Sequence, residues 1–170
     1  MTFTDWREPL RLLEEQSRPA TSDQWSLADK VGLRLGEDVP RAVASVLLED
    51  FLRPMVWGEA PDPATDKQRA FLVQLGAIDV AADADLSKAA GSAWIDHCLS
   101  LQNQQSLRDL RLARGDQVLK RWTSRDPASG IATEFLDHCV VSSIGTNGLV
   151  YFKGGNGKCG WPSSLQPTEA

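Results

Sequence analysis

Apolar side chains recur at three- and four-residue spacing through the first two-thirds of the chain, which predicts amphipathic helices. A first helix begins near Glu8 and ends at Arg18-Pro19. A second helix has Ser22 as its N-cap and ends at Gly36, and a third follows Pro40 and ends at Pro54. The predicted buried faces contain Trp6, Leu10, Leu13, Trp25, Ala28, Val31, Leu35, Val43, Val46, Leu47 and Phe51.

Residues 58–64 combine two prolines and two acidic residues without periodicity, which predicts a linker between domains. Thr65 and Gln68 then form a capping box that begins a helix ending at Gly76. An extended acidic stretch from Ile78 to Asp85 is predicted to follow. Ser87 caps the next helix, whose stripe is Ala90, Trp94, Cys98 and Leu101, and Ser106 begins a short basic helix that Gly115 closes.

The hydrophobic pattern changes to short β-prone runs near the C-terminus. After a first strand at 116–122, these runs are Val140–Ile144, Leu149–Lys153 and Lys158–Trp161. The separators 145–148 and 154–157 each contain Asn-Gly, the dipeptide that favours a type I′ hairpin turn. Two such hairpins predict a three-stranded antiparallel meander. No internal repeat of useful length is evident.

Two regions resemble known families. Lys67-Gln68-x-x-Phe71-Leu72-x-x-Leu75-Gly76, an extended link and 86–96 (LSKAAGSAWID) resemble a SAP-like, or helix–extended–helix, unit over about 65–101. This resemblance implies DNA contacts from Lys67, Arg69 and Lys88. Residues 115–166, with a short helical turn at Pro162-Ser163-Ser164 before the last strand, resemble a small β-barrel of the Tudor or KOW-like kind. Such barrels bind nucleic acid, peptides or neighbouring subunits.

The expected architecture is therefore α+β, with a helical N-terminal two-thirds followed by a small antiparallel β-barrel. The expected divisions are a helical domain (1–57), the linker (58–64), the SAP-like unit plus the basic helix (65–114), the barrel (115–166) and a tail (167–170).

Charge is uneven along the 170 residues, whose net charge is −5. Residues 1–103 carry ten basic and seventeen acidic side chains, a net charge of −7, whereas residues 104–170 carry eight and six, a net charge of +2. The C-terminal part is thus the better candidate for approaching phosphates. Three cysteines without a framework, no long apolar run and no basic-then-apolar N-terminus predict a cytoplasmic protein.

Candidate reaction chemistry finds little support in the spacing. Residues 154–159 lack the upstream glycine, the Ser or Thr after lysine and the helix of a phosphate-binding loop, so a hairpin turn is predicted there. Asp-His-Cys occurs at 96–98 and again at 137–139, and Cys159 adds a further thiol. Adjacent residues point in different directions, so core packing of Cys98 and Cys139 is favoured. A zinc site formed by one residue of each His-Cys pair together with Cys159 is the alternative.

A Cys–His nucleophile lacks the surrounding elbow and oxyanion loop, and the scattered carboxylates are best explained as solvated helix faces. We therefore expect no enzyme activity, metal or cofactor, no small-molecule substrate and no membrane association. The remaining candidate is a binding surface where basic groups alternate with aromatic ones. The alternative is that Trp122 and Trp161 belong to the barrel core and the lysines protect strand edges.

The predicted function is that of a bacterial accessory subunit that binds DNA or RNA through its C-terminal third within a larger assembly of other protein subunits. The predicted phosphate and stacking contacts are Arg111, Arg114, Lys120, Arg121, Tyr151, Lys153 and Lys158. The alternative is a protein–protein adaptor with no direct contact to nucleic acid.

Overall fold

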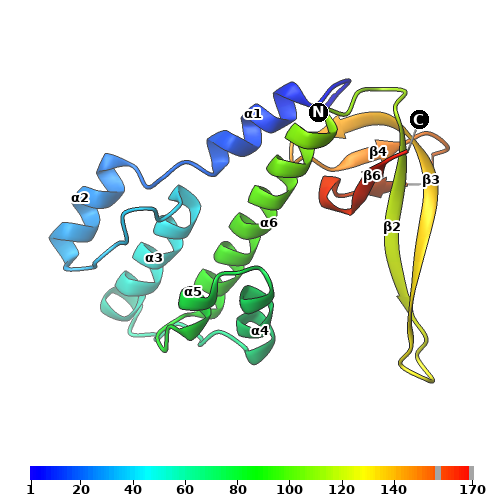
Figure 1. Cartoon of the computed structure of the whole chain (residues 1–170). Coiled ribbons are helices and arrows are strands. Elements are labelled where there is room, and N and C mark those ends of the chain that lie inside the picture. Colours follow the sequence, from blue (N-terminus) through cyan, green and yellow to red (C-terminus); the bar gives the residue numbers. More distant parts are fainter. Residues whose placement is uncertain (156–157, 169–170) are drawn as a thin grey trace. The chain divides into compact units, whose positions relative to one another are not determined.

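The computed structural model describes residues 1–155 and 158–168 and has an α+β architecture (Figure 1). Its helices are α1 Arg7–Gln16, α2 Ser22–Val31, α3 Arg41–Trp57, α4 Asp66–Gln74, α5 Ile78–Ala82 and α6 Lys88–Leu110. Its strands are β1 Thr2–Phe3, β2 Gln117–Arg125, β3 Ala132–Gly145, β4 Val150–Phe152, β5 Cys159–Gly160 and β6 Leu165–Pro167, with the 3₁₀ helix η1 at Pro162–Ser164. The predicted order, helices in the N-terminal two-thirds and then antiparallel strands, is confirmed.

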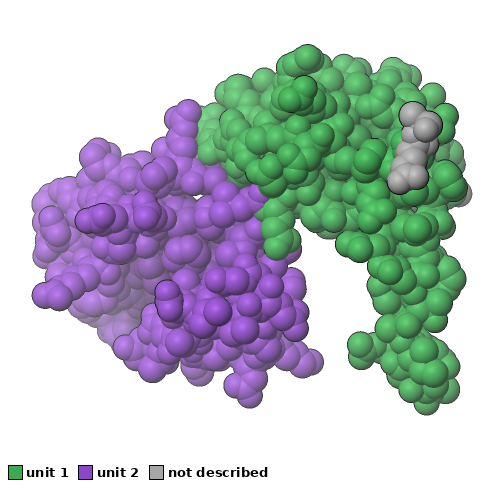
Figure 2. Space-filling model, viewed as in Figure 1, with its two compact units in different colours: residues 1–15, 102–170 green, residues 16–101 purple. Residues whose placement is uncertain are grey.

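The chain folds into two compact units, coloured separately in Figure 2. Unit 1 contains residues 1–15 and 102–170, and unit 2 contains residues 16–101. The divisions thus fall at the end of α1 and inside α6. The predicted linker, residues 58–64, lies within unit 2, where the backbone N–H of Ala64 donates to the Leu86 carbonyl oxygen.

The sheet of unit 1 has the strand order β5-β4-β3-β2-β6, and β1 pairs with β3 off this path. All of these strand pairs are antiparallel, which confirms the predicted meander and first strand. The helical turn before the last strand is also present, as η1. The sheet is not closed into the predicted Tudor or KOW-like barrel, because β5 and β6 lie at opposite ends of the strand order. The two-residue strand β5 pairs only with β4 among the described strands.

The first Asn-Gly turn differs from the predicted type I′ turn. Of its central residues only Gly148 has a positive φ, at +81°, and Asn147 does not. The N–H of Gly145 donates to the Leu149 carbonyl oxygen, and the N–H of Gly148 donates to that of Gly145. This pattern matches a three-residue loop in which a turn is followed by a left-handed residue. The second predicted turn contains Asn156-Gly157, which lies outside the described residues.

The core of unit 1 is formed by one face of the sheet together with α1 and α6. Its buried residues are Leu13, Leu107, Leu112, Val118, Val141, Ile144, Val150, Phe152 and Leu165. Val150 and Phe152 of β4 are both buried, and Tyr151 between them is half-buried. The alternative that Trp122 and Trp161 are core residues is wrong, since they are 40% and 45% exposed.

In unit 2 the helix boundaries differ from prediction in three places. The N-cap of α2 is Thr21 rather than Ser22, and it forms a capping box with Gln24. The same helix ends at Gly32, whose φ of +80° closes it before Gly36. Helix α3 continues past Pro54 to Trp57, because a proline in a last turn removes only one intrahelical hydrogen bond.

Two further corrections concern residues 78–110. The predicted extended stretch from Ile78 to Asp85 contains the short helix α5. The two helices predicted from Ser87 and Ser106 are one 23-residue helix, α6, whose N-cap hydroxyl on Ser87 accepts from the Ala90 N–H at 2.9 Å. No described helix combines the length and apolar character needed to cross a membrane.

Unit 2 contains an internal repeat, which corrects the interpretation that the chain has none. Pro19-Ala20-Thr21-x-x-Gln24 returns as Pro63-Ala64-Thr65-x-x-Gln68, and both copies form a capping box. Each glutamine then reaches the next long helix in the same way. The Gln24 Nε2 donates to the Arg41 carbonyl oxygen at 2.9 Å and to Ser45 Oγ at 2.8 Å, and the Gln68 Nε2 donates to the Lys88 carbonyl oxygen at 2.9 Å and to Ser92 Oγ at 2.9 Å.

The backbone follows the same course in both copies. Each first helix is followed by a glycine in the left-handed region, Gly32 at +80° and Gly76 at +85°. An isolated β-bridge joins the start of each copy to the start of its second long helix, Pro19 to Pro40 and Pro63 to Ser87. We therefore define residues 17–51 as the first helix–link–helix repeat and 61–98 as the second. The second link is three residues longer and contains α5.

Candidate interaction surface

Strands β2 and β3 extend together beyond the rest of unit 1 as a two-stranded ribbon (Figure 1). They pair continuously from Gln117 opposite Val140 to Arg125 opposite Ala132. Strand β6 pairs with β2 only at residues 118–120, and β4 pairs with β3 only from Val141 onward. Within the described residues, 121–125 and 132–136 therefore pair only with each other. We call residues 121–136 the β2–β3 ribbon; every residue in it is exposed.

One face of the ribbon carries a stacked aromatic pair. Trp122 lies directly opposite Phe135, with ring centroids 4.6 Å apart and planes inclined by 19°. The Trp122 Nε1–H donates to Asp137 Oδ2 at 2.9 Å, which fixes the orientation of the indole. Stacking of this kind stabilises a cross-strand pair by about 0.5–1.5 kcal/mol. Both residues are nevertheless 40% exposed, so a defined apolar surface faces solvent.

The other face of the ribbon and its tip are also ordered. Leu136 is 54% exposed, and Ile131 beside the tip is 65% exposed. Arg121 lies 3.3 Å from Glu134 across the ladder in an ion pair. The Asp126 carboxylate organises the tip by accepting from the Ala128 N–H and the Ser129 hydroxyl, and these hydrogen bonds lower the pKa of that carboxyl group.

The residues predicted to contact nucleic acid are only partly brought together. The Lys120 Nζ donates to the Cys159 carbonyl oxygen at 2.8 Å, and Lys120 lies opposite Asp137 in the ladder. Arg121 is paired with Glu134 as described above. Tyr151 is half-buried on β4, while exposed positions are occupied by Arg111, Arg114, Lys153 and Lys158. Arg111 follows α6 in the left-handed region, with a φ of 47°.

Two of the predicted lysines do share a cavity. Lys120 and Lys158 line a hollow of about 340 Å³, together with Asp137, His138, Cys139 and Phe152. The hollow therefore contains one carboxylate beside its two ammonium groups. Burial and the neighbouring Asp137 raise the pKa of the Cys139 thiol, while Lys120 and Lys158 oppose that shift. A raised pKa keeps this thiol protonated at neutral pH, which makes it a weak nucleophile.

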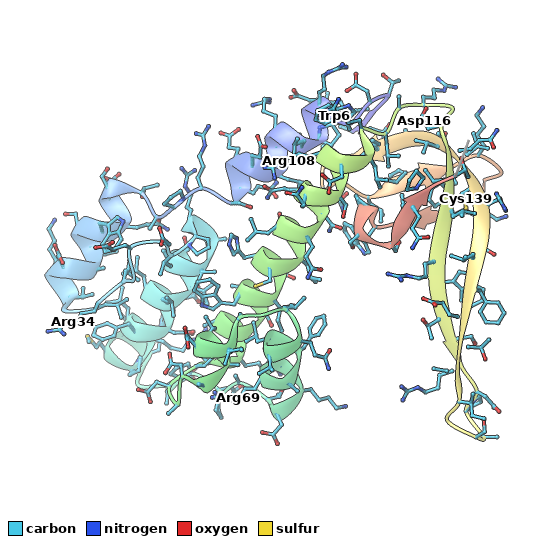
Figure 3. All side chains as sticks on the ribbon, viewed as in Figure 1. Trp6, Arg34, Arg69, Arg108, Asp116 and Cys139 are labelled. Atoms are coloured by element: carbon cyan, nitrogen blue, oxygen red, sulfur yellow. The ribbon has the colours of Figure 1, made fainter. Side chains whose placement is uncertain are left out.

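The two Asp-His-Cys triplets lie in different units. Residues 96–98 are on α6 in unit 2, and residues 137–139 are on β3 in unit 1, where Figure 3 labels Cys139. Burial also raises the pKa of the Cys98 thiol. Among residues 1–155 and 158–168, no three His, Cys, Asp or Glu side chains are grouped as metal ligands would be. The structure thus does not bring the two triplets into one compact unit.

His97 should make the stability of unit 2 depend on pH. Its ring contacts Trp94 edge-on, with centroids 6.0 Å apart, and burial lowers its pKa below the ordinary value of 6.5. The unfolded chain therefore binds a proton more readily than the folded chain, so stability is complete above that value and falls as the pH drops from it toward the lower pKa of the folded state. Urea denaturation at about pH 7.5 and about pH 5.5 should show a smaller decrease for His97→Gln than for the wild type. Equal decreases would contradict this assignment.

The ribbon is the main surface element that the sequence pattern did not indicate. The predicted strand at 116–122 covers only the first part of β2, and the predicted strand Val140–Ile144 covers only the end of β3. The pattern therefore does not indicate Ile131, Phe135 and Leu136 as part of a surface. A usable signal was present, because Asp126-Pro127-x-x-Gly130 is a turn sequence between two runs rich in β-branched and aromatic residues. In the SAP-like region, Arg69 is occupied by the link, since its Nη1 donates to the carbonyl oxygens of Ala81 and Asp83 (Figure 3).

Comparison of the chain with protein-family models, curated proteins and solved structures gave no match. The proposed function therefore rests on the geometry of the described residues. Two features of unit 1 are candidate binding sites. One is the exposed ribbon with its stacked aromatic pair, and the other is the cavity that Lys120 and Lys158 share.

Proposed function

We propose that this chain is a non-catalytic adaptor that docks a partner protein through the β2–β3 ribbon. The observation that carries the proposal is the stacked Trp122–Phe135 pair, in which Trp122 is also held by a hydrogen bond and each residue is nevertheless 40% exposed. Aromatic side chains held rigidly at a surface lose little entropy on binding and contribute large contact area. Ile131 and Leu136 extend the apolar surface to the tip and the second face.

Among residues 1–155 and 158–168, no strand covers either edge of the ribbon. A two-stranded hairpin is only marginally stable by itself in water, so a partner protein that covers the ribbon would stabilise it. Backbone groups at an open edge can pair with an extended segment of a partner, while side-chain pockets give specificity. The segment 121–136 contains Arg121 and Arg125 against Asp126 and Glu134, and it is therefore neutral overall. A neutral apolar surface suits a protein partner better than a phosphate backbone.

The net charges of the two compact units also favour a protein partner over nucleic acid. Unit 2 carries eight basic and thirteen acidic side chains, a net charge of −5. Unit 1 carries ten of each sign, because α1 and the residues before it bring Asp5, Glu8, Glu14 and Glu15 to the basic C-terminal part. Arg108 is 2.8 Å from Glu14 in one resulting ion pair. The excess of +2 in residues 104–170 is thus cancelled within unit 1.

A second candidate is the accessory subunit that binds DNA or RNA within a larger bacterial assembly. The cavity shared by Lys120 and Lys158 favours it, with Lys153 and Arg114 exposed elsewhere in unit 1. The resemblance of residues 65–101 to SAP-like units supports the same candidate. In this proposal the lysines neutralise phosphates and Tyr151 stacks on a base.

Two variants of the tagged full-length chain distinguish these functions. We expect Trp122→Ser with Phe135→Ser to lower the recovery of a co-purifying protein at least about tenfold, because the aromatic anchors carry the binding energy. Lys153→Glu with Lys158→Glu should leave that recovery unchanged. Circular dichroism of both variants should match the wild type, since all four side chains are at the surface.

The nucleic-acid candidate makes the opposite prediction in an anisotropy titration. Binding of a labelled DNA or RNA oligonucleotide at low salt, weakened steeply by added salt and abolished by the lysine variant, would replace the adaptor proposal. Unchanged recovery of the co-purifying protein with the Trp122→Ser/Phe135→Ser variant would also contradict the adaptor proposal. The adaptor proposal expects no oligonucleotide binding at either salt concentration.

A further inference from the structure

The two repeats of unit 2 contact each other through equivalent side chains. When the repeats are aligned on α3 and α6, Val46 and Leu47 of α3 correspond to Ala93 and Trp94 of α6. Ala93 and Trp94 pack against the core of the first repeat. Val46 and Leu47 pack against the core of the second repeat. Each repeat thus presents the same two positions to the other.

This reciprocity is the signature of an isologous contact. In a twofold-symmetric dimer, residue i of one copy contacts residue j of the other, and j contacts i in return. Leu47 and Trp94 stand at equivalent positions of the two repeats, and each packs against the core of its own repeat and against the core of the other. The contact also conserves side-chain volume. The second repeat contributes the small Ala93 and the large Trp94, and the first repeat contributes Val46 and Leu47, which are both of intermediate size. The contact is therefore specified by shape as well as by symmetry.

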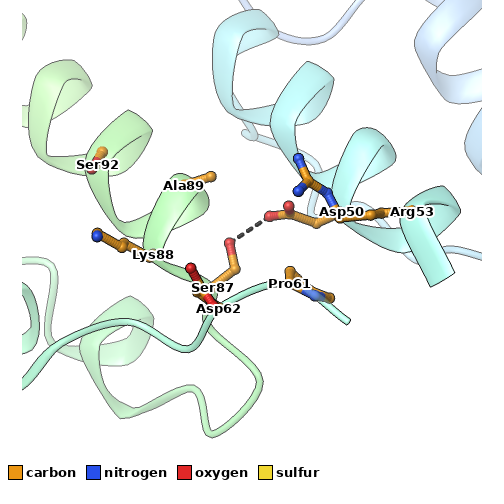
Figure 4. A pocket seen from close by; sticks show the side chains of 8 residues that line it. All are labelled: Asp50, Arg53, Pro61, Asp62, Ser87, Lys88, Ala89 and Ser92. Carbon is orange, nitrogen blue, oxygen red and sulfur yellow. Dashed lines mark hydrogen bonds between the residues drawn. The ribbon is translucent and has the colours of Figure 1, made fainter. Parts of the chain in front are cut away.

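Two cavities flank this contact at equivalent positions. One has about 300 Å³ and lies between the end of α3 and the start of α6; Figure 4 shows Asp50, Arg53, Ser87 and Ala89 in its wall. The other has about 220 Å³ and lies between the start of α3 and the middle of α6. Its corresponding residues are His97 for Asp50, Ser100 for Arg53, Pro40 for Ser87 and Ala42 for Ala89. Two hollows related in this way follow from a twofold arrangement of two like modules.

The two cavities lie at equivalent positions in the two repeats but are lined by different side chains. Asp50 accepts a hydrogen bond from the Ser87 hydroxyl, so the first repeat supports the N-cap of α6 (Figure 4). The equivalent positions, His97 and Pro40, do not reproduce that bond, and α3 has no side-chain cap. The hydrogen bond between Asp50 and Ser87 therefore has no counterpart between His97 and Pro40, whereas the apolar contact at positions 46, 47, 93 and 94 is reciprocal.

We infer that unit 2 is an internal dimer, in which the surface around Val46-Leu47 or Ala93-Trp94 is a self-complementary docking face for a second copy of the same helix–link–helix repeat. Each repeat buries few apolar residues of its own: six in the first core and four in the second. Cores of that size are insufficient for a stable domain by themselves, so each repeat depends on its partner. This inference concerns unit 2 and is independent of the ribbon.

Reciprocal exchange of the contact residues in the full-length chain tests the inference. Val46→Ala with Leu47→Trp places tryptophan at both equivalent positions, and Ala93→Val with Trp94→Leu removes tryptophan from both. We expect each half-exchange to lower the thermal midpoint of unit 2 by about 5 °C or more, through overpacking or a void. The full exchange of all four residues restores the complementary pair, and its midpoint should lie within about 3 °C of the wild type.

A second measurement keeps the test decisive if one half-exchange does not fold. Gln24→Ala and Gln68→Ala each remove the same hydrogen bonds from a half-buried capping glutamine, and we expect equal decreases in thermal midpoint. A full exchange as unstable as the less stable half-exchange would overturn the inference. So would half-exchanges as stable as the wild type, or glutamine variants whose midpoints differ by more than about 5 °C.

Discussion

Replacing Gly148 by valine is expected to lower the free energy of unfolding of unit 1 by about 2–5 kcal/mol. Gly148 has a φ of +81°, a conformation that residues with a Cβ adopt only at a cost. A Cβ at this position would lie 2.8 Å from Leu13 Cδ1 and 3.6 Å from Leu107 Cδ1. Leu13 and Leu107 are both buried in the core, so moving either side chain to make room for the valine disturbs the packing around it. Urea denaturation followed by circular dichroism measures the loss.

Gly154→Val provides the matched control. Gly154 also has a positive φ, +110°, but none of the described residues lies within 4 Å of the position that a Cβ would occupy there. This variant should show only the conformational cost of about 1–2 kcal/mol. Equal losses for the two variants would mean that the β3–β4 turn does not pack against α1 and α6 as described.

Truncating Leu107 to alanine is expected to cost about 2–5 kcal/mol of unfolding free energy, the range for removing a fully buried leucine. Leu107 has no exposed surface and lies in the core of unit 1 with residues of α1 and the sheet. The loss combines the transfer of the removed groups with the cavity left behind. Denaturant titration of the variant and the wild type gives the difference directly.

Ile131→Ala is the corresponding control at the surface. Ile131 is 65% exposed beside the ribbon tip, and its truncation should change the unfolding free energy by less than about 0.5 kcal/mol. A comparable loss in both variants would contradict the placement of Leu107 in the core of unit 1. The same control variant is informative for function, because Ile131 belongs to the proposed docking surface.

Local signals in the sequence were sufficient for much of the fold. The Thr65–Gln68 capping box and the Ser87 N-cap both form as predicted, because side-chain hydrogen bonds to the first turn are determined by nearby residues. The helical turn at Pro162–Ser164 before β6 also forms. These features depend on interactions spanning only a few residues, which is why pattern alone predicts them.

The features that pattern did not predict depend on contacts distant in sequence. Strand β3 extends back to Ala132 because β2 pairs with it along its length, and short-range propensity does not reveal that register. Placing the N-cap of α2 at Ser22 instead of Thr21 hides the repeat, because it displaces Gln24 from its equivalence with Gln68. In the candidate site, the hydrogen bond of Lys120 to Cys159 and the ion pair of Arg121 with Glu134 arise from strand pairing, which no short-range pattern reveals.

Hydrogen exchange of the full-length chain, alone and with its co-purified protein partner, tests the adaptor proposal most directly. We predict that amides of residues 121–136 exchange at least about tenfold more slowly in the complex, because their open strand edges and exposed faces become covered. Amides around Lys153 and Lys158 should be unchanged. Protection confined to that lysine region, with the ribbon exchanging as fast as in the free chain, would contradict the adaptor proposal.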